Sequence, residues 1–189
     1  MEHATFPRAA LLALCCASAV AACAIAPRTS PPAKEAATMT TSHPDWASSD
    51  QISALKQGID ELAASDFSDI DRLNRHLSAN LQKRSQDKYY ATWLSETGAF
   101  AGVATKSIEL RVQNKSASQA LLIIELAEPG PNAEIFVRRF WPNAEFTPPS
   151  PHGAGSPSYW LIEQGNGLVS ISHPYDDGRI GRISFDHMP

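Results

Sequence analysis

Cysteine is scarce in this chain and confined to one end. The three cysteines of its 189 residues are Cys15, Cys16 and Cys23, and none follows Cys23. Beyond that point the chain can form no disulfide, no CxxC redox pair, no thiolate nucleophile and no zinc site built on cysteine. The stability of the remaining chain must therefore come from burial of its side chains.

An excess of positive charge is also missing. Sixteen basic and 20 acidic residues give a formal net charge of −4. A mildly acidic protein has no general electrostatic attraction for nucleic acid or for anionic lipid. We therefore expect no nucleic-acid partner.

Recognisable catalytic motifs are absent as well. The sequence has no S-x-x-K, no H-E-x-x-H and no glycine loop of the phosphate-binding kind. Ser156 lies among glycines but lacks the G-x-S-x-G spacing, and no carboxylate pair stands out for glycoside hydrolysis. We therefore predict a protein that is not an enzyme and that has no catalytic residues, metal site or cofactor.

The N-terminus has the pattern of a secretory leader. Arg8 precedes an apolar run over residues 9–17, and small residues follow it up to Cys23. The tetrapeptide Val20-Ala21-Ala22-Cys23 resembles the lipobox of bacterial lipoproteins. That resemblance implies a signal peptide over residues 1–22 and acylation of Cys23 with palmitate-type chains.

The same resemblance implies a location. In such lipoproteins a residue other than Asp after the cysteine favours the outer membrane, and Ala24 stands there. One myristoyl chain holds a protein only marginally, whereas the triacylated cysteine implied here holds it for good. We expect a lipid-anchored protein on the periplasmic face of the outer membrane.

Other readings of the leader stay open. A cut after Ala17-Ser18-Ala19 gives a soluble periplasmic protein, and Ala24-Ile25-Ala26 is a further possible cleavage site. Residues 9–26 left uncut are barely long enough to span a membrane, and many of them are alanine.

Residues 23–47 are predicted to be the lipidated cysteine and a disordered tether. Prolines recur there among Ala, Ser and Thr, with almost no large apolar side chains to bury. The predicted single domain then covers residues 48–189.

The domain opens with two patterns of helical period. The apolar residues of the first are Ile52, Leu55, Ile59 and Leu62, and Ser48 with Gln51 has the spacing of a capping box. The second has Ile70, Leu73, Leu77 and Leu81 on one face and places Lys83 and Arg84 on the polar side.

A period of two over residues 108–112 predicts a strand, and a run over residues 120–126 that is apolar on both sides predicts the central strand of the sheet. Strand patterns cover residues 108–112, 120–126, 159–162, 168–172 and 180–185, with Gly165-Asn166-Gly167 and Asp177-Gly178 as turn signals. The predicted fold is α+β: two N-terminal helices packed on an antiparallel sheet of about five strands, with a short helical crossover.

The crossover itself is ambiguous in sequence. Ile135 and Val137 suit a strand over residues 132–141, but Pro131-Asn132 suits a helix start and Pro142 an abrupt stop. We favour the helix. A proline-rich loop is predicted to follow over residues 142–157.

The segment His173-Pro174-Tyr175-Asp176-Asp177-Gly178 gathers groups that can bind a cation or transfer protons. Its position between two strands favours a β-turn, for which Asp and Gly are suited by their backbone preferences.

Aromatic residues beside the stiff loop suggest a protein interface, because Trp and Tyr dominate interface energies. Ordinary burial of large aromatic residues is the simpler alternative. The candidate partner-binding residues are Trp141, Phe146, His152, Tyr159, Trp160, His173, Tyr175, Asp176 and Asp177.

In architecture and location the chain is similar to the small lipoprotein immunity proteins and lysozyme-type inhibitors of Gram-negative bacteria. The similarity implies that it binds another protein, an effector enzyme that degrades the cell envelope, and blocks its cleft. One alternative is a structural or accessory lipoprotein of an envelope complex. Another is an envelope hydrolase that uses His173 with Asp176 or Asp177.

Overall fold

The computed structural model describes residues 46, 48–151, 156–165, 167–173 and 177–187. The predicted leader, the lipidation site at Cys23 and most of the predicted tether lie outside these residues, as do His152, Tyr175 and Asp176. Trp46, which the prediction assigned to the tether, is half-buried against the core, and its indole N–H donates to the carbonyl of Pro129 at 3.1 Å.

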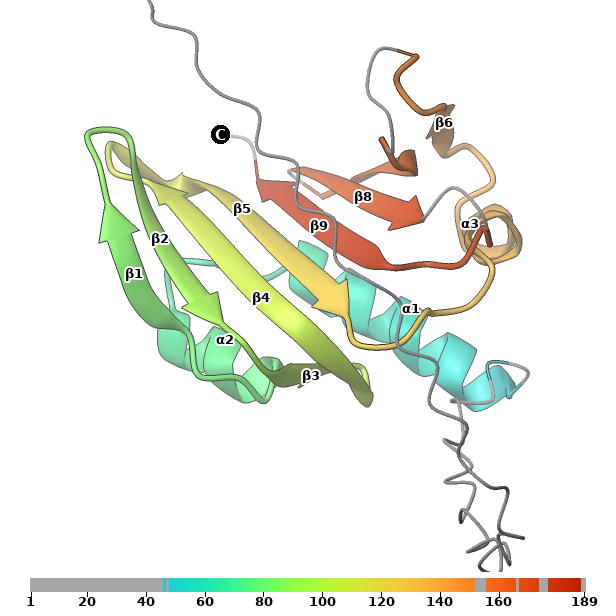
Figure 1. Ribbon diagram of the computed structural model, residues 1–189, viewed down its shortest axis with the longest axis horizontal. Coiled ribbons are helices and arrows are strands. Elements are labelled where there is room, and N and C mark those ends of the chain that lie inside the picture. The colour runs from blue at the N-terminus through green and yellow to red at the C-terminus, as the bar shows by residue number, and fades with distance from the viewer. Residues whose placement is uncertain (1–45, 47, 152–155, 166, 174–176, 188–189) are drawn as a thin grey trace, which may run out of the picture. The chain divides into compact units, whose positions relative to one another are not determined.

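The domain is α+β, with a large antiparallel sheet and three helices in the part of the chain that is described (Figure 1). The helices are α1 (Ser49–Ala63), α2 (Ile70–His76) and α3 (Ala133–Phe140). None of these helices has the length and apolar character needed to cross a membrane. The strands are β1 (Gln82–Gln86), β2 (Tyr90–Ser95), β3 (Gly98–Phe100), β4 (Val103–Gln113), β5 (Ser116–Leu126), β6 (Glu145–Thr147), β7 (Ser158–Gln164), β8 (Gly167–His173) and β9 (Arg182–His187).

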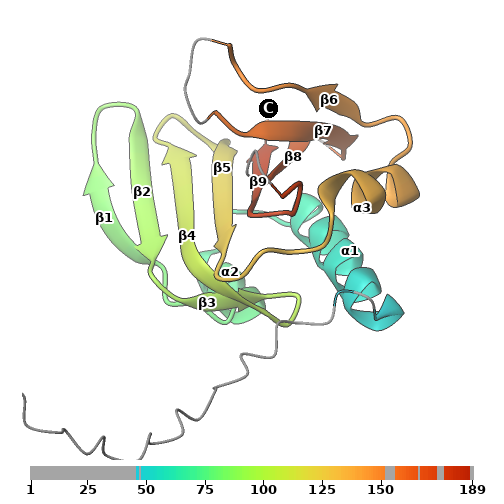
Figure 2. The same cartoon turned by 45° about the vertical axis from the view of Figure 1, so that its right-hand side comes forward.

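The sheet consists of two antiparallel meanders joined at one pair of strands. Its order is β1-β2-β4-β5-β9-β8-β7-β6, and β3 adds to β4. The joint is the antiparallel pairing of β5 with β9, in which Leu122 lies opposite Phe185 and Ile124 opposite Ile183. The chain between these two strands forms α3 and then β6 to β8, so α3 lies beside the second meander (Figure 2).

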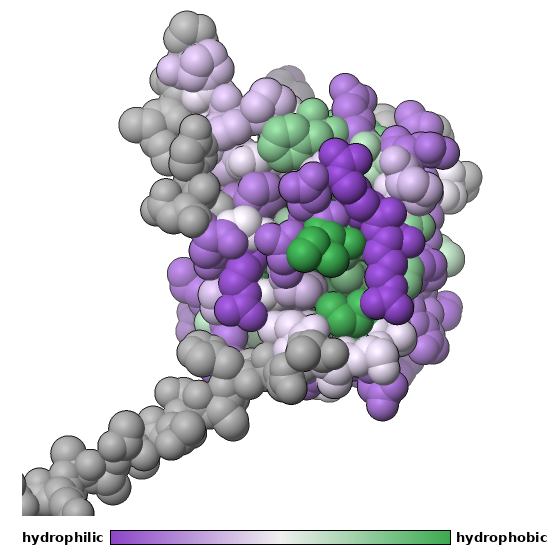
Figure 3. Space-filling model, turned by 90° about the vertical axis from the view of Figure 1, so that its right-hand side faces the viewer, coloured by the Kyte–Doolittle hydropathy of each residue, from purple (hydrophilic) through white to green (hydrophobic). Residues whose placement is uncertain are grey.

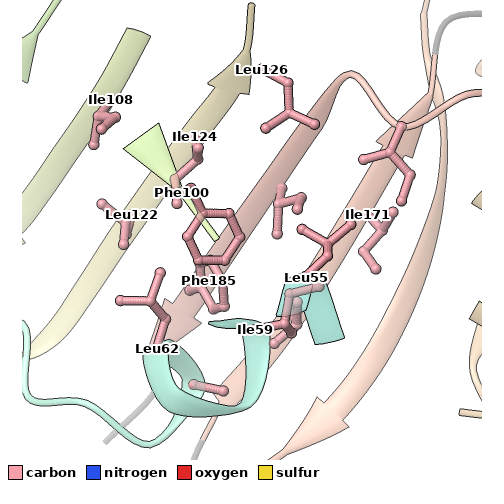
Figure 4. Packing of buried hydrophobic residues seen from close by; sticks show 14 of the residues in the cluster. Leu55, Ile59, Leu62, Phe100, Ile108, Leu122, Ile124, Leu126, Ile171 and Phe185 are labelled. Carbon is pink, nitrogen blue, oxygen red and sulfur yellow. The ribbon is translucent and has the colours of Figure 1, made fainter. Parts of the chain in front are cut away.

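Helix α1 lies on one face of the sheet and closes the core. The Ser48 hydroxyl accepts a hydrogen bond from Gln51 N at 3.2 Å, as a capping residue does. The apolar side of α1 presents Leu55, Ile59 and Leu62 to Phe100 and Phe185 in the core (Figure 4). On β5 alternate residues from Ala120 to Leu126 face the same core, which is the two-residue period of a strand.

The prediction of about five strands was wrong, because the described residues already form a sheet of nine. Four of the five predicted strands lie within longer strands of the sheet, and the fifth, predicted over residues 180–185, overlaps β9, which begins only at Arg182. The missed strands β1 to β3 and β6 lack the sequence alternation that marks burial on one face. Strand β1 is exposed along its whole length, and β3 and β6 have three residues each. The predicted loop over residues 142–157 therefore contains a strand.

The second predicted helix, whose apolar face ran to Leu81, was too long. Helix α2 ends at His76, and Ser78 takes a positive φ of 44° that turns the chain away. The side-chain oxygen of Asn74 then accepts from Leu81 N at 2.7 Å, which keeps Leu81 buried after the helix has ended. Lys83 and Arg84 consequently belong to β1 and not to a helix face.

An ion pair spans the joint between the meanders. Arg182 on β9 donates to Glu125 on β5 at 2.5 Å, and the side chains are 48% and 28% exposed. The hydrogen bond from Arg182 is the main cause that holds the pKa of Glu125 below its usual value; burial opposes it.

We predict that Glu125→Gln lowers the free energy of unfolding by under about 1 kcal/mol at neutral pH, the usual range for an exposed pair. A carboxyl whose pKa is lower in the folded state stabilises the fold above the unfolded pKa, and this contribution is lost as pH falls through the folded pKa. Urea unfolding should therefore show the difference between wild type and variant shrinking below about pH 4, near the ordinary Glu pKa. A difference that persists at pH 2 would contradict this account.

Candidate functional site

Helix α3 carries an exposed surface that combines an apolar side chain with charged ones. We call the exposed side of α3 (Glu134, Ile135, Arg138, Arg139) together with Phe146 of β6 the α3–β6 face. Ile135 is 70% exposed and Phe146 is 45% exposed. Figure 3 shows the side of the molecule that carries α3, where strongly apolar groups lie between strongly polar ones.

Both ends of α3 follow from the local sequence. The side chain of Asn132 accepts from Ile135 N at 3.0 Å and caps the first turn. Trp141 ends the helix, and Pro142 follows it. Within residues 132–141 the structure therefore has the helix that Pro131-Asn132 and Pro142 indicated, and not a strand.

The chain before β9 holds the helix start in place. Ala133 N donates to the carbonyl of Gly178 at 2.8 Å, and Ile180 N donates to the carbonyl of Pro131 at 3.0 Å. The guanidinium of Arg179 donates to the carbonyl of Gly130 at 2.9 Å. Helix α3 is therefore fixed to the main body at its N-terminal end.

The helix buries one side and exposes an isoleucine on the other. Ala133, Phe136 and Val137 are buried against the sheet. Ile135 lies on the polar side with Arg138 and Arg139 and is largely exposed. Single exposed apolar side chains are common on protein surfaces, so the interest of Ile135 lies in the cavity that it lines together with Trp46 and Ile52.

An aromatic cluster borders this face. The ring of Phe146 lies 5.0 Å from that of Trp160 and 6.5 Å from that of His173, measured between centroids. The guanidinium carbon of Arg138 lies 4.9 Å from the centroid of the Trp160 ring. The structure therefore brings together three of the predicted site residues, from β6, β7 and β8, and adds an arginine from α3.

Trp160 carries a buried polar group without a hydrogen-bond partner among the described residues. It is 4% exposed, and its indole nitrogen makes no hydrogen bond within the described part of the chain. A buried donor that lacks an acceptor costs about 1–3 kcal/mol. Most buried polar groups do have partners, so this one requires an explanation.

A second aromatic group lies at the other end of α3. The rings of Phe136, Phe140 and Trp141 are 5.3 to 6.0 Å apart, and the ammonium of Lys56 lies 5.4 Å from the Trp141 ring. Trp141 and Phe140 line a cavity of about 690 Å³ that extends to Leu161 of β7.

Two further cavities adjoin the same helix. One of about 480 Å³ is lined by Trp46, Ile52, Ile135 and Arg139, and one of about 190 Å³ by Asn132, Arg138, Phe146 and Trp160. Residues of α3 therefore line all three of these cavities.

The other predicted site residues lie apart from this face or serve the backbone. Tyr159 is half-buried, and because residues alternate along β7 it points to the opposite side of the sheet from Trp160. The carboxylate of Asp177 accepts from Arg179 N at 2.8 Å, a local bond typical of a turn. Among the described residues, no group of three or more His, Cys, Asp or Glu side chains is placed to hold a metal ion.

Sequence reasoning missed Ile135 and the two arginines of the α3–β6 face. Ile135 was counted as evidence for a strand. Once α3 is recognised as a helix with Phe136 and Val137 inward, Ile135 falls on the polar side, and this mismatch is the signal that could have identified it. Nothing in the sequence places Arg138 over Trp160, because that contact depends on how α3 sits against β7.

In three comparisons, no protein-family model, no curated protein and no solved structure matches this chain. The functional argument therefore rests on the residues of the α3–β6 face.

If Ile135 is kept for binding and not for stability, its loss should leave the fold intact. We predict that Ile135→Ala changes the free energy of unfolding by no more than about 0.5 kcal/mol, as for an exposed position. The control Val137→Ala removes a buried β-branched residue from the same helix and should cost about 2 kcal/mol. Chemical denaturation of both variants tests this, and equal losses would mean that Ile135 is a packing residue.

Proposed function

We propose that this protein is a lipid-anchored protein of the outer membrane, facing the periplasm, that binds and neutralises another protein through its α3–β6 face. The partner we propose is an effector enzyme that degrades the cell envelope, and the protein itself has no catalytic role. The leader and Val20-Ala21-Ala22-Cys23 support the location. The observation that carries the binding role is Ile135, 70% exposed on a charged helix between cavities.

The composition of the face supports a protein partner. Binding surfaces combine apolar and aromatic anchors with arginine, which keeps part of its guanidinium free for acceptors on the partner. Here Ile135 and Phe146 are the exposed anchors, and Arg138 and Arg139 flank them. The cavities beside α3 offer space for side chains of the partner.

The alternative of an accessory lipoprotein that adds a partner strand to a sheet edge has less support. The edge strand β1 carries Lys83 and Arg84 and is interrupted by an irregularity in register between Lys83 and Ser85. Charged side chains and bulges are the devices by which sheet edges avoid pairing. At the opposite edge β6 has only three residues, and Pro148 and Pro149 follow it.

The hydrolase alternative depends on His173 with Asp176 or Asp177. The ring of His173 stacks near Phe146 with an interplanar angle of 17°, and Asp177 is engaged with Arg179 N. These contacts suit a binding surface and a turn better than a proton-transfer pair.

We predict that Cys23→Ser abolishes metabolic labelling with an alkyne analogue of palmitate and releases the protein from the membrane fraction. The reason is that the thiol is the only acyl acceptor in the lipobox-like tetrapeptide. Cys16→Ser, which changes a cysteine of the leader, is the matched control and should keep both labelling and membrane attachment. A mature N-terminus beginning at Val20 in the wild type would show that the protein is not a lipoprotein.

We predict that a photo-crosslinking amino acid at Ile135 captures one discrete partner in intact cells. The matched control is Tyr89, which is 59% exposed and lies just before β2, outside the α3–β6 face. The captured protein should degrade peptidoglycan or phospholipid when purified. Stoichiometric addition of the wild-type protein should suppress that activity, and Ile135→Asp should weaken the suppression by more than tenfold, as loss of a central anchor does.

Two outcomes would count against this function. Identical adducts from Ile135 and Tyr89 would mean that α3 is not the binding face. Capture of an envelope-assembly protein without hydrolytic activity would favour the accessory role.

A further inference from the structure

The cavity of about 190 Å³ beside α3 has several hydrogen-bond donors in its wall. Its walls include Asn132, Glu134 and Arg138 from the helix region and Phe146, Trp160 and His173 from the sheet. Gly178 closes it on the side of β9. A cavity of this size accommodates one side chain but not a larger ligand.

Trp160, whose side chain lines this cavity, carries an indole N–H that lacks an acceptor within the described ranges. An indole nitrogen donates but cannot accept, so only an acceptor can satisfy it. No such acceptor is bonded to it in the part of the chain that is described. The residue is 96% buried, since 4% is exposed, so bulk water does not readily serve as a partner.

Arg138 adds a second donor to the same cavity. Its Nε donates to Glu134 at 2.9 Å, and its guanidinium lies over the Trp160 ring at 4.9 Å. The two terminal nitrogens of the guanidinium have no hydrogen bond to any described residue. Together they form the planar fork that binds carboxylates with two parallel bonds.

Asn132 is the third residue of the cavity wall with a side-chain hydrogen-bond donor that this argument uses. Its side-chain oxygen is used in the cap of α3, so the amide nitrogen is the atom left for a ligand. The N-terminal end of α3 contributes partial positive charge at the same place. The one carboxylate in the wall, Glu134, is already paired with Arg138.

We propose that this cavity is a carboxylate pocket that receives an acidic side chain of the partner protein. The Trp160 indole, the Asn132 amide and the outer nitrogens of Arg138 donate to the carboxylate, and Phe146 packs against its methylene groups. The proposal rests on the function proposed above, because it takes the α3–β6 face as the binding surface. A phosphate dianion is a worse fit, since the wall offers one arginine that Glu134 already neutralises in part.

The first test uses free carboxylates as probes. The full-length protein, labelled with ¹⁵N at tryptophan and purified in detergent, is titrated with N-acetylglutamate, with its neutral analogue N-acetylglutamine and with inorganic phosphate. The Trp160 indole signal, identified by its loss in Trp160→Phe, should move downfield and saturate at millimolar N-acetylglutamate. The signals of Trp46, Trp93 and Trp141 should stay in place. No movement, or an equal response to N-acetylglutamine or to phosphate, would overturn the proposal.

The second test removes the donors in the complete protein. Trp160→Phe deletes the N–H but keeps an aromatic ring, and we expect it to lower cross-linking from position 135 at least tenfold without lowering the melting temperature. Trp93→Phe, a half-buried tryptophan on β2 outside the cavity, is the matched control and should leave the cross-link unchanged. If Trp160→Phe proves unstable, Arg138→Gln tests the same pocket from the exposed side.

The outcomes separate the two proposals. A partner that cross-links from Ile135 equally well in wild type, Trp160→Phe and Arg138→Gln would overturn the carboxylate pocket and leave the binding function standing. Absence of any cross-link from Ile135 would overturn the binding function, and the N-acetylglutamate titration would then decide whether the pocket takes a carboxylate at all.

Discussion

The pairing of β5 with β9 determines the positions of the other elements, because no other pairing between the described strands joins the two meanders. Strand β5 is the last of the first meander, and β9 is both its neighbour and the last strand of the second. The intervening chain must therefore leave the sheet after Leu126 and build the second meander outward from β9. That path puts α3 next to β8 and exposes one side of it. The joint is apolar toward the core, where Leu122 faces Phe185, and carries the Arg182–Glu125 pair on its other side.

Sequence and structure agree best where a strand carries a run of buried apolar residues. Strand β5 was predictable because residues 120–126 are almost all apolar, and β7, β8 and β9 were predictable because glycine turns separate short apolar runs. Strands β1 and β6 were missed because an exposed or three-residue edge strand has no buried face, and so leaves no periodic signal. The second helical pattern, by contrast, predicted more helix than the structure contains. Leu81 is buried like the helix residues before it, but it enters the core from a loop held by Asn74.

The candidate site was only partly visible in the sequence, for a physical reason. Aromatic residues near a proline-rich loop could be listed, but their grouping depends on strand pairing between β6, β7 and β8. Phe146 meets Trp160 because the two residues are partners in that register. Arg138 reaches the same ring only through the packing of α3, which no local pattern encodes. The predicted leader, by contrast, rests on a purely local signal, and it lies outside the described residues.

The buried indole of Trp160 links the fold to the proposed binding role. In a domain whose stability is a small difference between large terms, an unsatisfied donor that costs about 1–3 kcal/mol is a considerable loss. Phenylalanine at this position would fill much of the same space and remove the loss. Position 160 does not need an N–H to complete the cluster with Phe146, since ring contact alone does that. A donor that weakens the free protein but stabilises a complex is the kind of local conflict that marks functional positions in otherwise consistent sequences. Ile135 on the α3–β6 face fits this reasoning, because a largely exposed apolar side chain gains little from burial in the isolated domain.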